Sequence, residues 1–575
     1  MDILSGIVTF CDRGETQGSD FPVANGENFS PISHNVYIKA SEGKQFHNPK
    51  TKVTVALLGY VSNLEELKNK YQLSSQPEGD LAAIEELYSR KQGSAPISAL
   101  DGVFSIFIWD ENAQTGYLFQ DRYGSNLPIY YFSSRDRFVF GSNLKEILPY
   151  LPIPREIDAK AAQEFLHTNR EIPNEHTLIK GIFKLLPQQS LMVFPKHNKY
   201  GVAQIKTKPK MAAQELARNQ LLPSIEKQLN RLLGLANKNQ LGMALSSGYD
   251  TNFIASLLAK LKDKKITAIT IGGKDVNEIP AAQKCADSYH NIKHTGALLA
   301  PDILQSLPDI VWRLEGYVCE RGILLSYELA SQFQQQGINC VFLGDGADQV
   351  LQPYSSFALE RYKRKIHEMI KSSLVGKYFY RAIKKYKDDT QHKQYQFSSS
   401  FKMKLKNVKY DIILDYILKK NGIIFNSYGI QPFYPFLNQD TADYAVAIRK
   451  SSKGRKYYEG EVIKKLDYRV SRLLQKKGGS TDIGYILEGQ SHIIQQLLDK
   501  ECLQKLFTPQ QKAELISHPH YYAEIILQIL YIYLFDRLFI SGKYDRYFHQ
   551  PGLDVKLDEA IAEMDPEESV GCLHG

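Results

Sequence analysis

The chain has 575 residues and a formal net charge of +8 at pH 7. Because one hydrophobic core rarely organises so many residues, we expect at least two domains. The small basic excess permits an anionic ligand without requiring nucleic acid. The six cysteines form no CxxC pair, which favours free thiols in a reducing cytoplasm. No signal peptide is expected, and the apolar stretch Ile525–Phe535 is too short to span a bilayer, so it predicts a buried helix.

Residues 1–200 are expected to form an α+β domain of stacked layers. Short apolar or alternating segments bounded by turn residues are typical of strands. The predicted strands are Ser5–Cys11, Val53–Val61, Val103–Trp109, Gly116–Phe119, Ile129–Phe132, Phe138–Phe140 and Ser190–Val193. Helical segments at Leu64–Tyr71 and Leu81–Ser89 interrupt them, which indicates layers of strands and helices. The polar, basic segment Lys196–Lys210 is predicted to be a linker.

From residue 213 onward, predicted helices alternate with predicted strands. The helices are Glu215–Leu233, Ile279–Tyr289 and Leu324–Gln335, and the strands are Leu241–Leu245, Ile266–Ile271 and Cys340–Leu343. This alternation predicts right-handed crossovers and a parallel sheet, and therefore an α/β domain. Ligands bind at the carboxyl ends of such strands, so we expect three loops to meet there: Ser246–Asp250, Ile271–Gly273 and Gly344–Asp348.

The first of these loops is a candidate phosphate site. Ser246, Ser247 and Gly248 have little bulk, so backbone N–H groups can surround an anion at the start of a helix predicted near Thr251. Asp250 would repel phosphate but suits a magnesium ion beside it. A Walker loop is excluded because no Gly-Lys-Ser/Thr sequence follows. An ordinary strand–turn–helix connection explains the same residues equally well.

Two charged regions complete the chain. Residues 361–410 contain fifteen Lys and Arg residues among aromatic ones. Such a pattern can mark an RNA surface, but the modest overall charge favours a solvated face beside an anion site. Residues 551–575 are rich in acids and are predicted to be a mobile tail.

Four segments in matching order resemble the asparagine synthetases of the B type. Residues 246–251, Ser-Ser-Gly-Tyr-Asp-Thr, are similar to the pyrophosphate loop Ser-Gly-Gly-x-Asp-Ser, and residues 344–349 to Gly-Glu/Asp-Gly-Ala-Asp-Glu. The helix start at 278–282 and the segment 433–438 also match. The resemblance reaches about residue 485. It implies an Ntn-hydrolase-like glutaminase domain at 1–200, and an ATP-binding domain of the adenine nucleotide α-hydrolase (PP-loop) type with a helical C-terminal part at 211–550.

The N-terminal half resembles the glutaminase domain of that family but lacks its reacting groups. Residues 121–124, residues 128–131 and Lys145 match its framework. The family's nucleophile is a cysteine after the initiator methionine, where this chain has Asp2, and its Asn-Gly-Glu oxyanion segment reads Leu58-Gly59-Tyr60. Loss of both groups predicts that the chain does not hydrolyse glutamine. Cys11 is no substitute, because it lies in a predicted strand.

Relatives without that cysteine, the β-lactam synthetases and lasso-peptide cyclases, use an amine already present in the substrate. The resemblance therefore implies ATP-dependent acyl-adenylate formation followed by amide formation, with macrolactam cyclisation of a lasso-type precursor peptide as the predicted reaction. An ammonia-dependent asparagine synthetase is the alternative, and a non-catalytic scaffold is disfavoured by intact Asp250 and Asp348. Residues 475–481 and the helical segment after them resemble the cyclases.

The resemblance implies ATP and Mg²⁺ as cofactors, with Asp250 and Asp348 as metal ligands. The residues expected to bind ATP or pyrophosphate are Leu245, Ser246, Ser247, Gly248, Tyr249, Asp250, Thr251, Ile271, Gly272, Gly344, Asp345 and Gly346. Lys477 or its neighbour Lys476 is the candidate for stabilising the oxyanion.

Glu315 is the candidate base for the incoming amine. A surface acid paired with Arg313 or Arg321 is the alternative for that residue. The expected partners are a peptide or small molecule that carries a carboxylate and an amine, and a precursor-processing protease; neither nucleic acid nor a membrane is expected.

Overall fold

A computed structural model describes most of the chain between residues 3 and 562. The residues outside the description are 1–2, 11–28, 34, 74–78, 92–96, 124–127, 169–171, 173–174, 188, 205–213, 237–239, 262, 274–276, 321, 348–349, 351–410, 449–461, 465–467, 475–482, 489, 499–508, 520–521 and 563–575. Asp2, Cys11, Arg321, Asp348, Lys476, Lys477 and the basic region 361–410 therefore lie outside the described residues.

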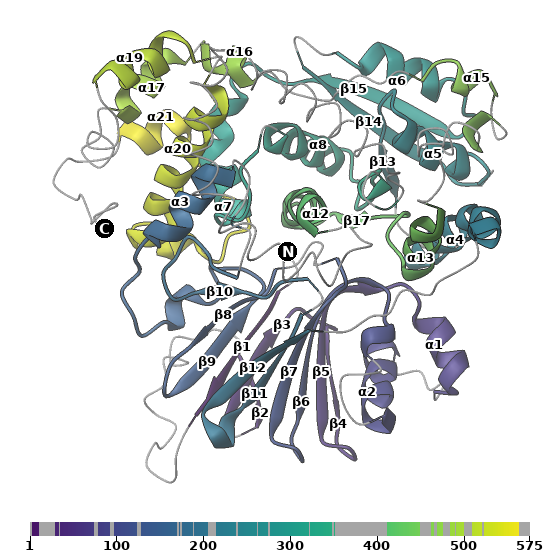
Figure 1. Cartoon of the computed structure of the whole chain (residues 1–575), viewed down its shortest axis with the longest axis vertical. Helices are drawn as coiled ribbons and strands as arrows, with labels where there is room; N and C mark the ends of the chain where they lie inside the picture. The colour runs from purple at the N-terminus through teal and green to yellow at the C-terminus, as the bar shows by residue number, and fades with distance from the viewer. Residues whose placement is uncertain are drawn as a thin grey trace, which may run out of the picture.

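Two six-stranded antiparallel sheets form the N-terminal domain, in the lower half of Figure 1. The first has the order β10-β8-β9-β1-β3-β2, with β1 (Leu4–Thr9), β2 (Ser30–Ser33), β3 (Val36–Ala40), β8 (Tyr130–Ser133), β9 (Arg137–Gly141) and β10 (Phe183–Lys184). The second has the order β12-β11-β7-β6-β5-β4, with β4 (Gln45–Asn48), β5 (Val53–Val61), β6 (Gly102–Asp110), β7 (Thr115–Gln120), β11 (Gln189–Phe194) and β12 (Lys199–Gln204). The layered α+β prediction is confirmed.

Alternating side chains of the second sheet build two cores on its opposite faces. Leu58 on β5 and Phe107 on β6 are buried between the two sheets. Val55, an odd-numbered neighbour on β5, is buried on the other face against helices α1 (Leu64–Tyr71) and α2 (Gly79–Lys91). The two faces of the sheet therefore contribute to different cores, because successive strand residues point to opposite faces.

The prediction of a linker at Lys196–Lys210 is wrong for the first half of that segment. Residues 199–204 form β12, which pairs antiparallel with β11 from Phe194–Lys199 to Gln189–Gln204. Its polar composition hid the strand, because an edge strand satisfies its backbone groups on one neighbour and can leave its side chains exposed. The sequence pattern also misses β2, β3, β4 and β10, which have only two to five residues each.

Five strands form the sheet of the C-terminal domain, in the order β15-β14-β13-β16-β17. They are β13 (Leu241–Ala244), β14 (Ile266–Gly272), β15 (Ile292–Leu298), β16 (Cys340–Phe342) and β17 (Gln431–Phe433). All four pairings are parallel, which confirms the α/β prediction. The helices between and around these strands are α4 (Gln214–Leu235), α5 (Tyr249–Leu258), α6 (Ile279–Ala286), α7 (Leu307–Leu314), α8 (Ile323–Gln335), α12 (Asp411–Ser427) and α13 (Gln439–Ile448).

Further helices follow β17 and form the C-terminal part at the upper left of Figure 1. They include α16 (Ile483–Glu488), α17 (Ser491–Leu498), α19 (Pro509–Ser517) and α20 (Ala523–Phe535). Most residues of α20 are buried, which confirms the buried helix predicted there. Among the helices of the described residues, none is long and apolar enough to cross a bilayer.

The mobile tail predicted from residue 551 is wrong for residues 557–562. They form α21 (Leu557–Ala562), and both Leu557 and Ile561 are buried. These two residues are four apart, so they lie on one face of the helix while the acids between them face outward. The acidic composition therefore concealed an amphipathic helix.

Aromatic contacts join the two domains. Phe165 on α3 (Ala159–Thr168) stacks on Tyr531 of α20 with 5.7 Å between ring centroids. Tyr60, near the end of β5, meets Phe433 edge-on at 5.4 Å. Phe433 is the last residue of β17, so the N-terminal domain contacts the C-terminal sheet at the carboxyl end of this strand.

Candidate active site

The turn between β13 and α5 is closed by its own side chains. The Ser246 hydroxyl accepts the Gly248 N–H at 3.1 Å and lies 2.9 Å from the Thr251 hydroxyl oxygen. The Asn252 amide donates to the carbonyl oxygens of Ser246 and Gly248, both at 2.8 Å. Helix α5 begins at Tyr249, two residues earlier than predicted, and no side chain caps its N-terminus within the described part of the chain. The N-terminus of a helix is a place where backbone N–H groups and the helix dipole favour an anion.

Three loops meet beside this turn. Strand β13 lies between β14 and β16 with parallel pairing, so the ends of all three strands face the same edge. The Thr270 hydroxyl donates to the Leu245 carbonyl at 2.6 Å, which ties the end of β14 to the turn. A Cβ atom at Gly344 would lie 3.2 Å from Thr251 Cγ2, so the loop after β16 touches the start of α5. The structure thus brings the three predicted segments together.

The loop after β16 requires glycine at Gly346. Its φ is +88°, a conformation that glycine adopts without steric cost. A Cβ atom there would also lie 2.5 Å from Leu437 Cδ2. Leu437 belongs to the segment 433–438 that carries part of the family resemblance, so two of its segments are in direct contact.

Two carboxylates of these loops interact through their charges. Asp250 lies in the first turn of α5, and Asp345 follows β16. Burial raises the pKa of Asp345, the Lys420 ammonium and a hydrogen bond from Asn421 lower it, and the Asp250 charge raises it again. Neighbouring carboxylates repel one another unless a cation lies between them, and carboxylate oxygens are the ligands that Mg²⁺ prefers. The donor set therefore fits a divalent cation.

No cluster of three potential metal ligands occurs among the described residues. Asp348, predicted as a metal ligand, lies outside them. The described chain thus contributes Asp250 and Asp345 to this part of the site.

Helix α12 adds polar groups that the sequence pattern does not single out. The Asn421 amide donates to Asp345 Oδ2 at 2.5 Å and its oxygen accepts the Ser326 hydroxyl at 2.7 Å. Lys420 Nζ lies 2.6 Å from Glu320 Oε1. The adjacent Lys-Lys-Asn residues at 419–421, between two apolar segments of the helix, are the sequence feature that could have revealed them.

Glu315, the predicted base, lies in the interface between the domains. Its carboxylate forms an ion pair with Lys145 Nζ at 2.9 Å and accepts the Leu144 N–H at 2.5 Å. The two charged side chains are only 4% and 3% exposed. Burial raises the pKa of Glu315, while the Lys145 charge and the Leu144 N–H lower it.

The alternative for Glu315, a surface acid paired with Arg313, is wrong. Arg313 Nε instead lies 2.8 Å from Asp309 Oδ2, and the same guanidinium donates to Ser427. Arg313 and Asp309 are four residues apart on α7 and share a face. Glu315 follows the end of α7 with a φ of +51°, which directs the chain away from that face.

The position of the family's oxyanion donor is occupied by an apolar side chain. Leu58 is 1% exposed and belongs to the core between the two sheets. A leucine side chain has no N–H or O–H group to donate to a developing oxyanion. The absence of glutaminase activity stays a prediction, because the assignment of Leu58 to the oxyanion position comes from the sequence resemblance.

Comparisons with known proteins agree with this arrangement. The sequence matches the family described as "Glutamine amidotransferase domain" over residues 36–202 and the family described as "Asparagine synthase" over residues 233–519. The glutamine-hydrolysing asparagine synthetase 1 of Bacillus subtilis is 22% identical over 324 residues, which are 55% of this chain and 49% of that protein. The matched families thus occur in the predicted order, a glutamine amidotransferase domain followed by an asparagine synthase domain.

Two further relatives show the same level of similarity. The putative glutamine-hydrolysing asparagine synthetase 2 of Methanocaldococcus jannaschii is 23% identical over 315 residues, 52% of this chain and 59% of that protein. Amidase chry2 of Gibberella zeae is 21% identical over 358 residues, 57% of this chain and 51% of that protein. The chain thus spans about half the length of the curated relatives it matches.

We predict that Lys145→Met destabilises the protein strongly. The substitution leaves the Glu315 carboxylate buried without its cation, a change that costs about 3–5 kcal/mol. Urea unfolding would measure the loss. The double variant Lys145→Met/Glu315→Gln is expected to recover part of it, because the uncompensated charge is gone.

Lys180→Met is the matched control, since the Lys180–Glu156 pair is 68% and 55% exposed. An exposed pair contributes roughly 0–1 kcal/mol, so this variant should unfold close to the wild-type midpoint. Equal stability of the Lys145→Met and Lys180→Met variants would contradict the structural role given to the buried pair.

Proposed function

The chain belongs to the asparagine synthetase family, and from this premise we propose that it forms amide bonds at the expense of ATP through an acyl-adenylate. The observation that carries the proposal is the contact between the turn 246–251 and the loop at Gly344, at the carboxyl edge of the parallel sheet. Such an edge is where ligands bind in open α/β sheets.

In the proposed reaction, a substrate carboxylate oxygen attacks the α-phosphorus of ATP and pyrophosphate leaves. An amine then attacks the acyl carbon and displaces AMP. The Ser246 and Thr251 hydroxyls and the first N–H groups of α5 would bind the departing pyrophosphate. Asp250 and Asp348 would hold Mg²⁺, which neutralises phosphate charge when bound, and the Asp345 charge, which interacts with that of Asp250, would favour the cation.

Glu315 is the proposed proton acceptor for the incoming amine. Burial raises its pKa, and a carboxylate with a raised pKa is a better base near neutral pH. Lys145 and the Leu144 N–H hold this carboxylate in one place, which favours a defined geometry for proton transfer. Lys477, or its neighbour Lys476, is proposed to stabilise the oxyanion.

We propose further that the amine belongs to the substrate itself. Asp2 and the buried Leu58 replace the groups that would release ammonia from glutamine, which supports an internal amine. Macrolactam cyclisation of a lasso-type precursor peptide, released by a processing protease, meets this requirement. The second candidate is synthesis of asparagine from free ammonia. Two relatives are named asparagine synthetases, which favours asparagine as the product, while both names specify glutamine as the nitrogen source.

The first prediction from this assignment is that the purified chain does not hydrolyse glutamine. Neither a thiol at residue 2 nor a polar donor at Leu58 is present, and both are needed for attack on the amide. Glutamate release from glutamine should stay at the level of a protein-free blank. Turnover well above that blank would refute the assignment.

The second prediction concerns adenylation. Asp250→Asn and Asp348→Asn should each abolish substrate-dependent ATP–pyrophosphate exchange, because each removes a negative ligand for the cation at the phosphates. Asp263→Asn, at an exposed position after α5, is the control and should exchange at the wild-type rate. Wild-type exchange in either site variant would remove that residue from the metal set.

The third prediction distinguishes the two amine sources. A linear peptide encoded beside this gene should lose one water when incubated with the enzyme and ATP, with AMP and pyrophosphate formed in equal amounts. Mass spectrometry would show the loss of mass. A much faster formation of asparagine from aspartate and ammonium than of any cyclised peptide would favour the second candidate.

A further inference from the structure

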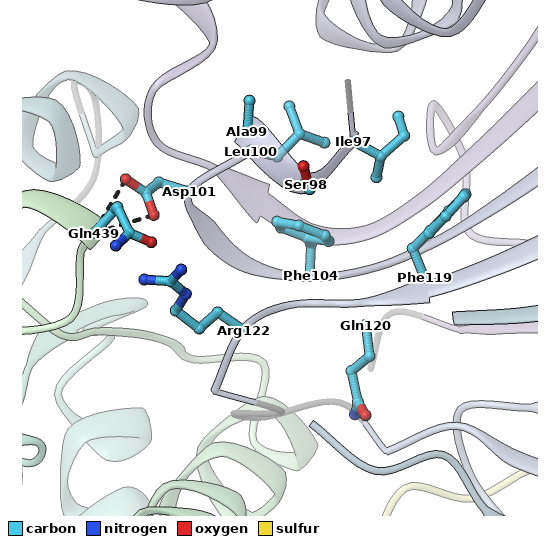
Figure 2. A pocket seen from close by; sticks show the side chains of 10 residues that line it. All are labelled: Ile97, Ser98, Ala99, Leu100, Asp101, Phe104, Phe119, Gln120, Arg122 and Gln439. Carbon is cyan, nitrogen blue, oxygen red and sulfur yellow. Dashed lines mark hydrogen bonds between the residues drawn. The ribbon is translucent and has the colours of Figure 1, made fainter. Parts of the chain in front are cut away.

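A cavity of about 80 Å³ lies where the N-terminal domain meets the start of α13 (Figure 2). Nine of the ten residues around it belong to the N-terminal domain, and the tenth is Gln439 of α13. One water molecule needs roughly 10–15 Å³, so the space admits a small solute rather than a single water.

Opposite charges line this cavity. The Asp101 carboxylate accepts the Gln439 N–H at 3.2 and 3.3 Å. The Arg122 side chain extends toward Asp101 and Gln439 in Figure 2. Among the described residues, its guanidinium forms neither a hydrogen bond nor an ion pair, with Asp101 or with any other group. A guanidinium with five donors is thus directed at the cavity and at an acid that it does not bind directly.

The opposite wall is apolar. Phe104 and Phe119 line the cavity and are 3% and 0% exposed, and Leu100 lies beside them. The cavity therefore offers a cation, an anion and an aromatic surface within a small volume. Pockets of this composition orient a ligand by a few polar groups and bind the remainder by apolar contact.

We propose that this cavity binds a small neutral α-amino acid. The ligand carboxylate pairs with the guanidinium of Arg122, whose planar fork suits a carboxylate. The ligand ammonium pairs with Asp101, and a short side chain rests on Phe104. The two ligand charges bridge the two protein charges, which do not pair with each other.

This site is separate from the former glutaminase centre. Leu58, at the position of the lost oxyanion donor, belongs to the core between the two sheets. Phe104 and Phe119 belong to the core on the other face of the second sheet, with α1 and α2. The two sites therefore lie on opposite faces of one sheet.

Occupation of the cavity would also strengthen the contact between the domains. Asp101 already accepts an N–H from α13, so a ligand held by Asp101 and Arg122 lies against an element of the other domain. A ligand that binds the folded state alone raises the unfolding temperature, and the rise grows with the logarithm of the free ligand concentration above the dissociation constant.

Calorimetric titration of the full chain with L-alanine tests the proposal, with acetate and methylammonium as probes that carry one charge each. L-Alanine should bind saturably, and each single-charge probe at least about tenfold more weakly, since it lacks one ion pair. Arg122→Met should lose this binding. Arg135→Met, which alters an exposed arginine outside the cavity, should keep it.

A second arm tests Asp101. The pKa of Asp101 is raised to about 6. Burial is the largest cause and Asp440 adds to it, and together they outweigh the lowering effects of Arg122 and Arg231 on this pKa. Both arginines stay charged, so acidification through pH 6 removes the negative charge of Asp101 and should weaken L-alanine binding. Asp101→Asn should bind weakly at every pH.

Two results would overturn the proposal. The first is the absence of saturable binding of L-alanine, glycine and L-serine to the wild-type chain. The second is equal affinity of the Arg122→Met and Arg135→Met variants. If Arg122→Met does not fold, Arg122→Lys replaces it, because lysine keeps the charge but loses the planar fork; wild-type affinity in that variant counts against the proposed carboxylate contact.

Discussion

The parallel pairing of β13 with β14 and β16 is the constraint on which the candidate active site depends. The register places Ala244 opposite Ile269 and Met243 opposite Phe342, so the three strands end within a few residues of one another. Segments a hundred residues apart in the chain thereby reach one edge. The small residues of the turn and Gly344 then let the loops approach closely, because side chains there would separate α5 from the loop after β16.

The N-terminal domain has a structural role in the interface with the C-terminal domain. It supplies Lys145 to the buried Glu315, and Lys184 to the face of the Tyr317 ring at 4.5 Å. Tyr130 meets the same ring at 6.3 Å. A chain without this domain would expose the charge of Glu315 and an aromatic surface to water. Replacement of the reacting groups is therefore compatible with retention of the whole domain.

Local sequence patterns predict much of the fold, but they do not predict most of the contacts between residues that are distant in the chain. The sequence predicts β5 and α1 with their observed bounds, because both have strong apolar periodicity. It misses β15, whose exposed and half-buried residues resemble a loop, although the strand pairs with β14 along seven residues. The partner of Glu315 lies 170 residues away on another domain, and no local pattern encodes such a contact. The turn 246–251 was predictable because its small residues and its neighbours form one continuous motif.

Helix α12 contacts both the loops of the candidate active site and the interface between the domains, and so fixes the spacing between them. Successive helical residues point about 100° apart, so three neighbours can face three surroundings. Lys419 is fully buried and donates to the Tyr317 hydroxyl in the interface, while Lys420 pairs with Glu320 and Asn421 binds Asp345 in the candidate site. One rigid helix therefore holds the carboxylate beside Asp250 at a set distance from the surface that receives the N-terminal domain. The role proposed for Glu315 depends on this distance, because a base must lie within hydrogen-bond reach of the proton that it accepts.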